Sequence, residues 1–174
     1  KGFDIAFVVL NKGWTLERTC KEIAQRARGT YTFHYRLSDL PVAKAYFFAH
    51  YRQFMSALLR NPRLSQSRTY IHFTHYTASN IPEKEVGRVL ALATHVFVMN
   101  ARTRDFLISI GVPSERVSVV YIGVDPSLFS PPTNHPAQKH TPVVGFCTRY
   151  ESYAEYAGRK SYGRIIDLIH KLLP

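Results

Sequence analysis

Apolar residues recur along this chain in short continuous runs, separated by segments with helical spacing. The clearest run covers residues 4–10 (DIAFVVL). Similar runs follow at 69–75, 95–100, 117–123 and 143–148, with a more aromatic one at 30–35. Runs that are apolar on both faces are typical of strands buried on both sides, as in parallel sheets. The pattern therefore predicts a parallel sheet.

The segments between these runs predict helices at 16–27, 43–60, 83–93, 101–110 and 162–173. The helix at 83–93 begins after Pro82, a favoured residue at the first turn. The helix at 101–110 is followed by Gly111 and then Val112-Pro113, which together are a typical helix stop. Strands that alternate with helices predict an α/β fold of the Rossmann-like type, with a doubly wound parallel sheet.

A proline-rich stretch at 130–142 (SPPTNHPAQKHTP) interrupts this alternation and has no apolar periodicity, so it predicts a linker. We expect a first domain at 1–129 and the first strand–helix unit of a second Rossmann-like domain at 143–174. The chain lacks an initiator methionine and stops soon after that unit begins. We therefore expect a fragment of a longer protein.

The 174 residues include 23 Lys and Arg against 12 Asp and Glu, a formal net charge of +11. Such an excess favours anionic partners: nucleic acid, phospholipid headgroups or a phosphorylated ligand. Between Lys12 and Arg68 there are 11 basic residues and 3 acidic ones. The two cysteines have neither disulfide-framework nor metal-ligand spacing, and no signal peptide is visible. We therefore expect a cytoplasmic protein.

Several motifs of catalytic α/β proteins are missing from the sequence. No GxGxxG follows a strand, and there is no Walker A loop, Asp-x-Asp pair or Gly-x-Ser-x-Gly elbow. Their absence disfavours a nicotinamide or flavin cofactor, a P-loop nucleotide, a metal held against a diphosphate, and a serine hydrolase. We expect no cofactor and no metal.

One stretch has a specific order of motifs (THVFVMNARTRDFLISIGVPSERVSVVYIGVDPSLFSPP). A strand ends at Asn100, a helix follows, Gly-Val-Pro-x-x-Arg-Val begins at Gly111, and Gly-Val-Asp-x-x-x-Phe-x-Pro begins at Gly123. This order resembles the end of the N-terminal domain of retaining GT-B glycosyltransferases of the group 1 family. The resemblance implies a transferase that moves a sugar from a nucleotide-diphosphate sugar to a glycan or lipid-linked acceptor, with retention and without a metal.

The same resemblance assigns candidate residues to the first domain. The loop after the first strand, with Asn11, Gly13 and Trp14, would face the donor phosphates and the acceptor. Glycine there lets backbone N–H groups approach an anion, and the following helix N-terminus adds attraction. His75, at the end of its strand, would touch the transferred sugar. An ordinary strand-to-helix turn and a merely exposed histidine are the simpler explanations.

In the second domain, the resemblance assigns Arg149 and Lys160 to the diphosphate of the leaving group. Two departures weaken this match, because Ser161 replaces the usual glycine and the loop before it is longer than in the family. Arg159 would then share or take over the role of Lys160. The remaining catalytic residues of the family lie further along, so we expect the fragment alone to be inactive.

Three other interpretations stay open. The basic, aromatic segment 43–60 would suit the anionic inner face of a membrane, unless its apolar stripe is core. The sequence pI of about 9.9 and the interleaved Tyr31, Phe33 and Tyr35 suggest a nucleic-acid-binding module. No nucleic-acid reader motif accompanies them, so we rank nucleic acid below the sugar substrates as a partner. A non-catalytic Rossmann-like interaction domain is the third interpretation.

Overall fold

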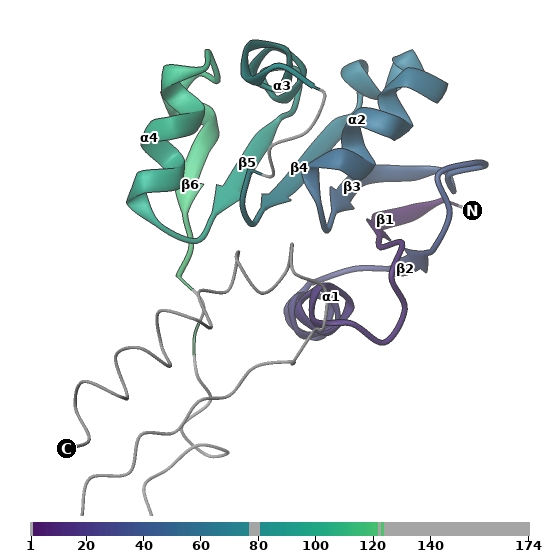
Figure 1. Ribbon diagram of the computed structural model, residues 1–174. Helices are drawn as coiled ribbons and strands as arrows, with labels where there is room; N and C mark the ends of the chain where they lie inside the picture. The colour runs from purple at the N-terminus through teal and green to yellow at the C-terminus, as the bar shows by residue number, and fades with distance from the viewer. Residues whose placement is uncertain (1, 77–80, 122, 124–174) are drawn as a thin grey trace, which may run out of the picture. The chain divides into compact units, whose positions relative to one another are not determined.

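A computed structural model describes residues 2–76, 81–121 and 123, which form an all-parallel, six-stranded sheet with helices on both faces (Figure 1). The strand order is β2-β1-β3-β4-β5-β6. The predicted Rossmann-like α/β fold is thus confirmed for this part of the chain. The described core lies in the first of the two units into which the chain divides, Lys1–Asp125. The predicted linker at 130–142 and second domain at 143–174 lie outside the described residues.

The strands are β1 (Phe3–Val8), β2 (Tyr31–His34), β3 (Ala43–Phe48), β4 (Arg68–Phe73), β5 (His95–Val98) and β6 (Val117–Val119). The α-helices are α1 (Thr15–Arg26), α2 (Tyr51–Arg60), α3 (Glu83–Leu90) and α4 (Ala101–Ser109). Short 3-10 helices at Pro62–Gln66 and Ser114–Arg116 precede β4 and β6.

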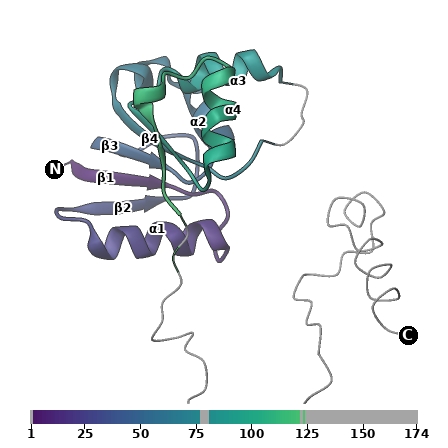
Figure 2. The same ribbon diagram turned by 90° about the vertical axis from the view of Figure 1, so that its left-hand side faces the viewer.

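The helices divide unequally between the two faces of the sheet. Figures 1 and 2 show α1 alone on one face, with α2, α3 and α4 together on the other. The chain changes face between β1 and β3, which are adjacent and in register, with Val8 opposite Phe48. Open parallel sheets bind ligands beyond the carboxyl ends of their strands at such a switch point. The edge beyond Val8 and Phe48 is therefore where a site is expected.

The larger core lies under α2, α3 and α4. It includes the fully buried side chains of Phe48, Phe54, Phe73 and Leu90. A smaller cluster around Phe7, Val9 and Cys20 lies under α1. Burying one such large apolar side chain contributes roughly 1.5–3 kcal/mol. The three-helix face therefore dominates the stability of the domain.

The predicted single helix over 43–60 is wrong. Residues Ala43–Phe48 form β3, a central strand between β1 and β4, and α2 begins only at Tyr51. Three consecutive aromatic residues, 46–48, fit a helical stripe and a doubly buried strand equally well in sequence. These residues form a strand because they pair in parallel with β1 on one side and β4 on the other. The apolar stripe of α2, with Tyr51, Phe54 and Met55, is part of the core.

Three residues of the Gly-Val-Pro-x-x-Arg-Val segment have a clear structural role. Gly111 ends α4 with φ of +102°, a conformation that favours glycine. Val112 is buried, and its N–H donates to the Leu107 carbonyl at 3.0 Å. The Arg116 guanidinium donates to the Ala91 carbonyl at 2.6 Å. The segment thus fastens α3, α4 and β6 together, and residues from 124 onward lie outside the described part.

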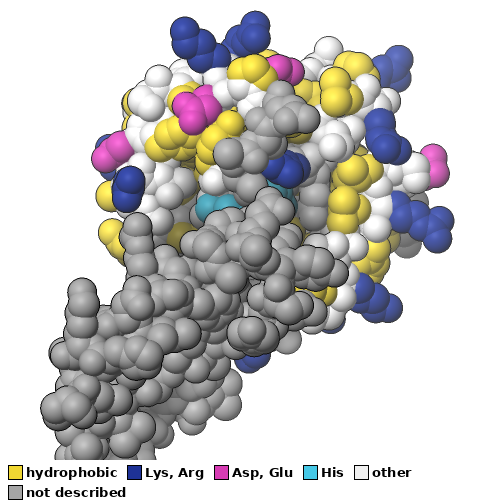
Figure 3. All heavy atoms as spheres, in the orientation of Figure 1, with side chains coloured by type: hydrophobic (Ala, Val, Ile, Leu, Met, Phe, Trp, Pro, Cys, Tyr) yellow, Lys and Arg dark blue, Asp and Glu magenta, His cyan; other side chains and the backbone are white. Residues whose placement is uncertain are grey.

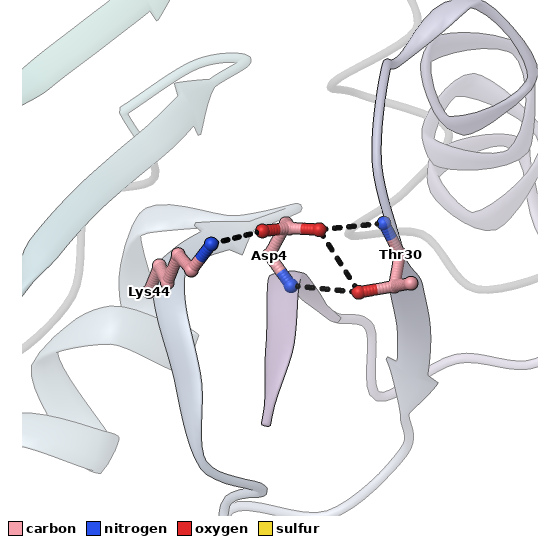
Figure 4. Close-up of polar contacts among 3 residues, drawn as sticks. All are labelled: Asp4, Thr30 and Lys44. Carbon is pink, nitrogen blue, oxygen red and sulfur yellow. Dashed lines mark hydrogen bonds and ion pairs between the residues drawn. The ribbon is translucent and has the colours of Figure 1, made fainter. Parts of the chain in front are cut away.

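At the amino edge of the sheet, Asp4 joins three strands (Figure 4). One carboxylate oxygen lies 2.6 Å from Lys44 Nζ at the start of β3, and the other accepts from the N–H of Thr30, just before β2, at 2.8 Å. The hydrogen bond from Lys44 and those from Thr30 lower the pKa of Asp4 to about 2. Gly29 packs so closely that a Cβ there would lie 2.6 Å from the Asp4 carboxylate.

Candidate functional site at the carboxyl edge

The loop after β1 holds the predicted phosphate-facing residues Asn11, Gly13 and Trp14. All three are exposed, and Trp14 is the N-cap of α1 without a side-chain hydrogen bond to the helix. Gly13 has φ of +82°, which explains the need for glycine. Its N–H, however, donates to the carboxylate of Glu17. The N–H group that was expected to meet a phosphate already has an anionic partner within the chain.

Glu17 is a buried carboxylate in the first turn of α1, where the helix dipole favours negative charge. Its oxygens accept from the Tyr35 hydroxyl at 2.6 Å and lie 3.0 Å from Lys21 Nζ. The Tyr35 hydrogen bond, followed by those from Gly13 and Lys21, lowers the pKa of Glu17 to about 2. The same bond raises the pKa of Tyr35 to about 12. An ionised Glu17 therefore repels a phosphate from this helix N-terminus.

At the switch point, the buried amide of Gln53 on α2 closes the end of β1. In the orientation that its partners require, the side-chain nitrogen donates to the Val8 carbonyl at 2.9 Å, and the oxygen accepts from the Leu10 N–H at 3.2 Å. The Val8 carbonyl also accepts from the Ala49 N–H at 3.1 Å, so Gln53 adds a second bond to that carbonyl and provides an acceptor for the Leu10 N–H just beyond β1. The bonds of Gln53 also fix the first turn of α2, and with it His50, against the sheet.

Two histidines follow neighbouring strands at this edge. His50 comes just after β3 as the N-cap of α2, and His75 comes just after β4. Their ring centroids are 6.3 Å apart, with the planes at 75°. His75 is exposed and its Nδ1 lies 3.0 Å from the Thr74 hydroxyl oxygen. The structure thus places His75 at the strand end where the sequence predicts it, beside a histidine that the sequence did not single out.

His50 is partly buried and its charge state is fixed by its surroundings. Burial, together with the positive potential of His75, Arg52 and His72, lowers the pKa of His50 to about 4. At neutral pH the ring is therefore uncharged. A neutral imidazole has one N–H donor and one nitrogen acceptor, so it can bind an oxygen ligand from either side.

His72 lies on the other face of the sheet, as its alternation with Ile71 and Phe73 requires. It lines a hollow of about 490 Å³ between α1 and the strands, together with Phe47 of β3 and Phe97 of β5. Burial lowers the pKa of His72. This apolar hollow faces away from α2, so it is separate from the two-histidine edge.

The remaining predictions concern a metal site, the membrane, the surface charge and the basic residues of the second domain. Among the described residues, no three His, Cys, Asp or Glu side chains are grouped so that they could hold a metal ion. No helix in that part of the chain is long and apolar enough to cross a bilayer. On the face in Figure 3, Lys and Arg side chains are spread around the outline of the described part instead of gathering in one patch. Arg149, Arg159 and Lys160 lie outside the described residues.

Two residues of this edge were missed by sequence reasoning. Glu17 lies inside the helix predicted at 16–27 and is not singled out by the sequence, although an acidic side chain in a first turn often bonds to nearby N–H groups. His50 was placed inside the wrongly predicted helix at 43–60. The useful signal was its position directly after an apolar run of strand length, the same position that His75 has after its own run.

Comparisons of the chain with protein-family models, with curated proteins and with solved structures found no match. The function must therefore be argued from the fold, the site residues and the sequence motifs.

Proposed function

We propose that this domain is the acceptor-side half of a retaining glycosyltransferase that uses a nucleotide-diphosphate sugar and no metal. The observation that carries the proposal is the position of His75, just beyond a central strand of a parallel sheet and close to the switch point. The motif segment that begins at Gly111 supports it. The acceptor would be a glycan or a lipid-linked saccharide.

The proposal assigns the transferred sugar and the leaving diphosphate to different residues. His75 contacts the sugar that is transferred. Arg149 and Lys160, with Arg159 as an alternative, bind the diphosphate and stabilise it as it leaves. Because Glu17 occupies the Gly13 N–H, the proposal assigns diphosphate binding to these basic residues and leaves the loop of Asn11 and Trp14 to the acceptor.

The first test, like the transfer tests below, uses the full-length protein, because the fragment alone is expected to be inactive. It measures thermal stabilisation by UDP-, GDP- and ADP-sugars, because a ligand that binds only the folded state raises its melting temperature. One of these donors should stabilise the protein, and Arg149→Ala or Lys160→Ala should weaken donor affinity by roughly ten- to a hundredfold, the value of a charge-assisted bond of about 1.5–3 kcal/mol. Arg104→Ala, which removes an exposed arginine of α4, is the matched control.

The second test is transfer itself. His75→Ala should abolish most sugar transfer while the donor still stabilises the protein, because the diphosphate is held elsewhere. Indifference to every nucleotide sugar would overturn the proposal. Salt-dependent binding to random oligonucleotides, in the absence of any donor effect, would favour the nucleic-acid alternative instead.

Contact with an anionic membrane surface remains a separate proposal. No single basic, aromatic helix covers 43–60, and the apolar stripe of α2 is part of the core, so this proposal rests on the positive charge of the chain alone. Sedimentation with anionic vesicles at low salt tests it directly, and absence of binding there would end it.

A further inference from the structure

The imidazole of His50 is held in one orientation by its own helix. Its Nδ1 accepts a hydrogen bond from the N–H of Arg52 at 3.2 Å. The ring also lies against the buried ring of Tyr51, with centroids 4.7 Å apart and planes at 31°. A ring restrained by one hydrogen bond and one aromatic contact has little freedom to rotate.

The hydrogen bond to Nδ1 also determines where the proton is. Because Nδ1 acts as an acceptor, a neutral ring carries its hydrogen on Nε2. Among the described residues, no hydrogen bond involves His50 Nε2. His50 therefore has a fixed N–H donor that no other residue in the described part of the chain uses.

His75 is arranged in a similar way. Its Nδ1 is engaged by the hydroxyl group of Thr74, and its Nε2 has no hydrogen-bond partner in the described part of the chain. With ring centroids 6.3 Å apart, the two histidines are too distant for a direct hydrogen bond, which requires about 2.7–3.2 Å between heavy atoms. Rings at this separation can accommodate one oxygen atom within hydrogen-bonding distance of both Nε2 atoms.

We propose that His50 is a second substrate-contacting residue and that His50 and His75 bind the same hydroxyl group of the sugar substrate. The inference rests on the proposed glycosyltransferase function. The hydroxyl oxygen accepts from His50 Nε2–H, and its own hydrogen points to His75 Nε2 when the His75 proton is on Nδ1, toward Thr74. A hydroxyl group suits this pair because it both accepts and donates, whereas a phosphate only accepts at neutral pH.

The decisive variant is His50→Asn, which separates the capping role from the substrate role. Asparagine is a good N-cap, so its side-chain oxygen can accept from the start of α2 and the domain should keep its melting temperature. Its amide is too short to replace Nε2–H. We expect kcat/KM for transfer to fall about tenfold, the cost of one hydrogen bond to the substrate. His72→Gln, on the opposite face of the sheet, should change kcat/KM little.

A double variant tests whether the two rings share one atom. If His50 and His75 bind the same hydroxyl group, His50→Asn combined with His75→Asn should cost clearly less than the product of the two single losses. Independent, multiplicative losses would show that the histidines contact different groups and would overturn the shared site.

A spectroscopic measurement adds a readout that a capping role does not affect. Long-range ¹H–¹⁵N spectra should show the His50 proton on Nε2 at neutral pH. The stabilising nucleotide sugar, added with a non-hydrolysable acceptor mimic, should shift the imidazole signals of both His50 and His75. If the parent protein binds the donor and transfers sugar, and His50→Asn has the same kcat/KM as the parent, this inference alone is overturned. Absence of both donor binding and transfer in the full-length protein would overturn the proposed function and this inference with it.

Discussion

The two edges of the sheet use their polar side chains in opposite ways. At the amino edge, both carboxylate oxygens of Asp4 are paired with groups of the domain itself, Lys44 and Thr30. At the carboxyl edge, His50 and His75 have one ring nitrogen each engaged locally and the other without a hydrogen-bond partner among the described residues. Complete internal pairing serves stability. Unused hydrogen-bonding capacity that is held rigidly in place is what a binding site needs.

The largest expected contrast between the edges is in pH dependence near neutrality. His50 has a pKa of about 4 in the folded domain against 6.5 in an unfolded chain. Between these values the unfolded chain binds a proton that the folded domain does not, so acidification should lower the free energy of unfolding, by on the order of 2–3 kcal/mol at pH 4.5. Urea unfolding at pH 7, 5.5 and 4.5 measures this, and His50→Asn should flatten the slope. Equal slopes in the two proteins would contradict the prediction.

Next in size is the effect of Gly29→Ala at the amino edge. The residue has φ of +103°, which alanine adopts only with strain, and the new Cβ would displace the Asp4 carboxylate. Strain of about 1 kcal/mol and weakened hydrogen bonds should together lower stability by about 2 kcal/mol. Gly13→Ala, with φ of +82° but open space around the Cβ, isolates the strain alone. Chemical denaturation of both variants would show whether Gly29→Ala is the more damaging, as expected.

Asp4→Asn should have a smaller effect with its own pH signature. Because the folded pKa is lowered, to about 2 from 3.8, the ionised carboxylate stabilises the domain above pH 3.8 and loses this contribution as the pH falls toward 2. The variant should therefore melt at a lower temperature than the parent at pH 6, and the gap should narrow by pH 3. Asp105→Asn, in an exposed pair 3.7 Å from Arg104, serves as control. A gap that stays constant with pH would mean that the charge is not what stabilises this edge.

The smallest stability effect is expected for His75→Ala. The side chain is exposed and packs little, so the free energy of unfolding should change by less than about 0.5 kcal/mol. Paired with Asp4→Asn, this variant tests the contrast directly: the amino edge loses stability, and the carboxyl edge loses sugar transfer. A marked loss of stability in His75→Ala would show that the carboxyl edge also stabilises the fold and would contradict the contrast between the two edges.

The sequence predicted most of the fold because doubly buried strands and capped helices leave local patterns. The run at 4–10 and the stop at Gly111 fall close to β1 and the end of α4. The strand β3 was missed because its aromatic residues satisfy helical and strand periodicity alike, and only pairing with β1 and β4 distinguishes them. His75 could be placed from its strand alone. His50 could not, because its significance depends on His75, which lies 25 residues later in the chain and follows the neighbouring strand β4.

The double engagement of His50 has a mechanical consequence. Since the amide of Arg52 donates to the same imidazole whose far nitrogen is offered to substrate, occupancy at that nitrogen should restrain the opening turn of α2. Hydrogen–deuterium exchange at the Arg52 amide would then slow when the site fills, so that this one backbone proton reports from inside the helix on what is bound outside it.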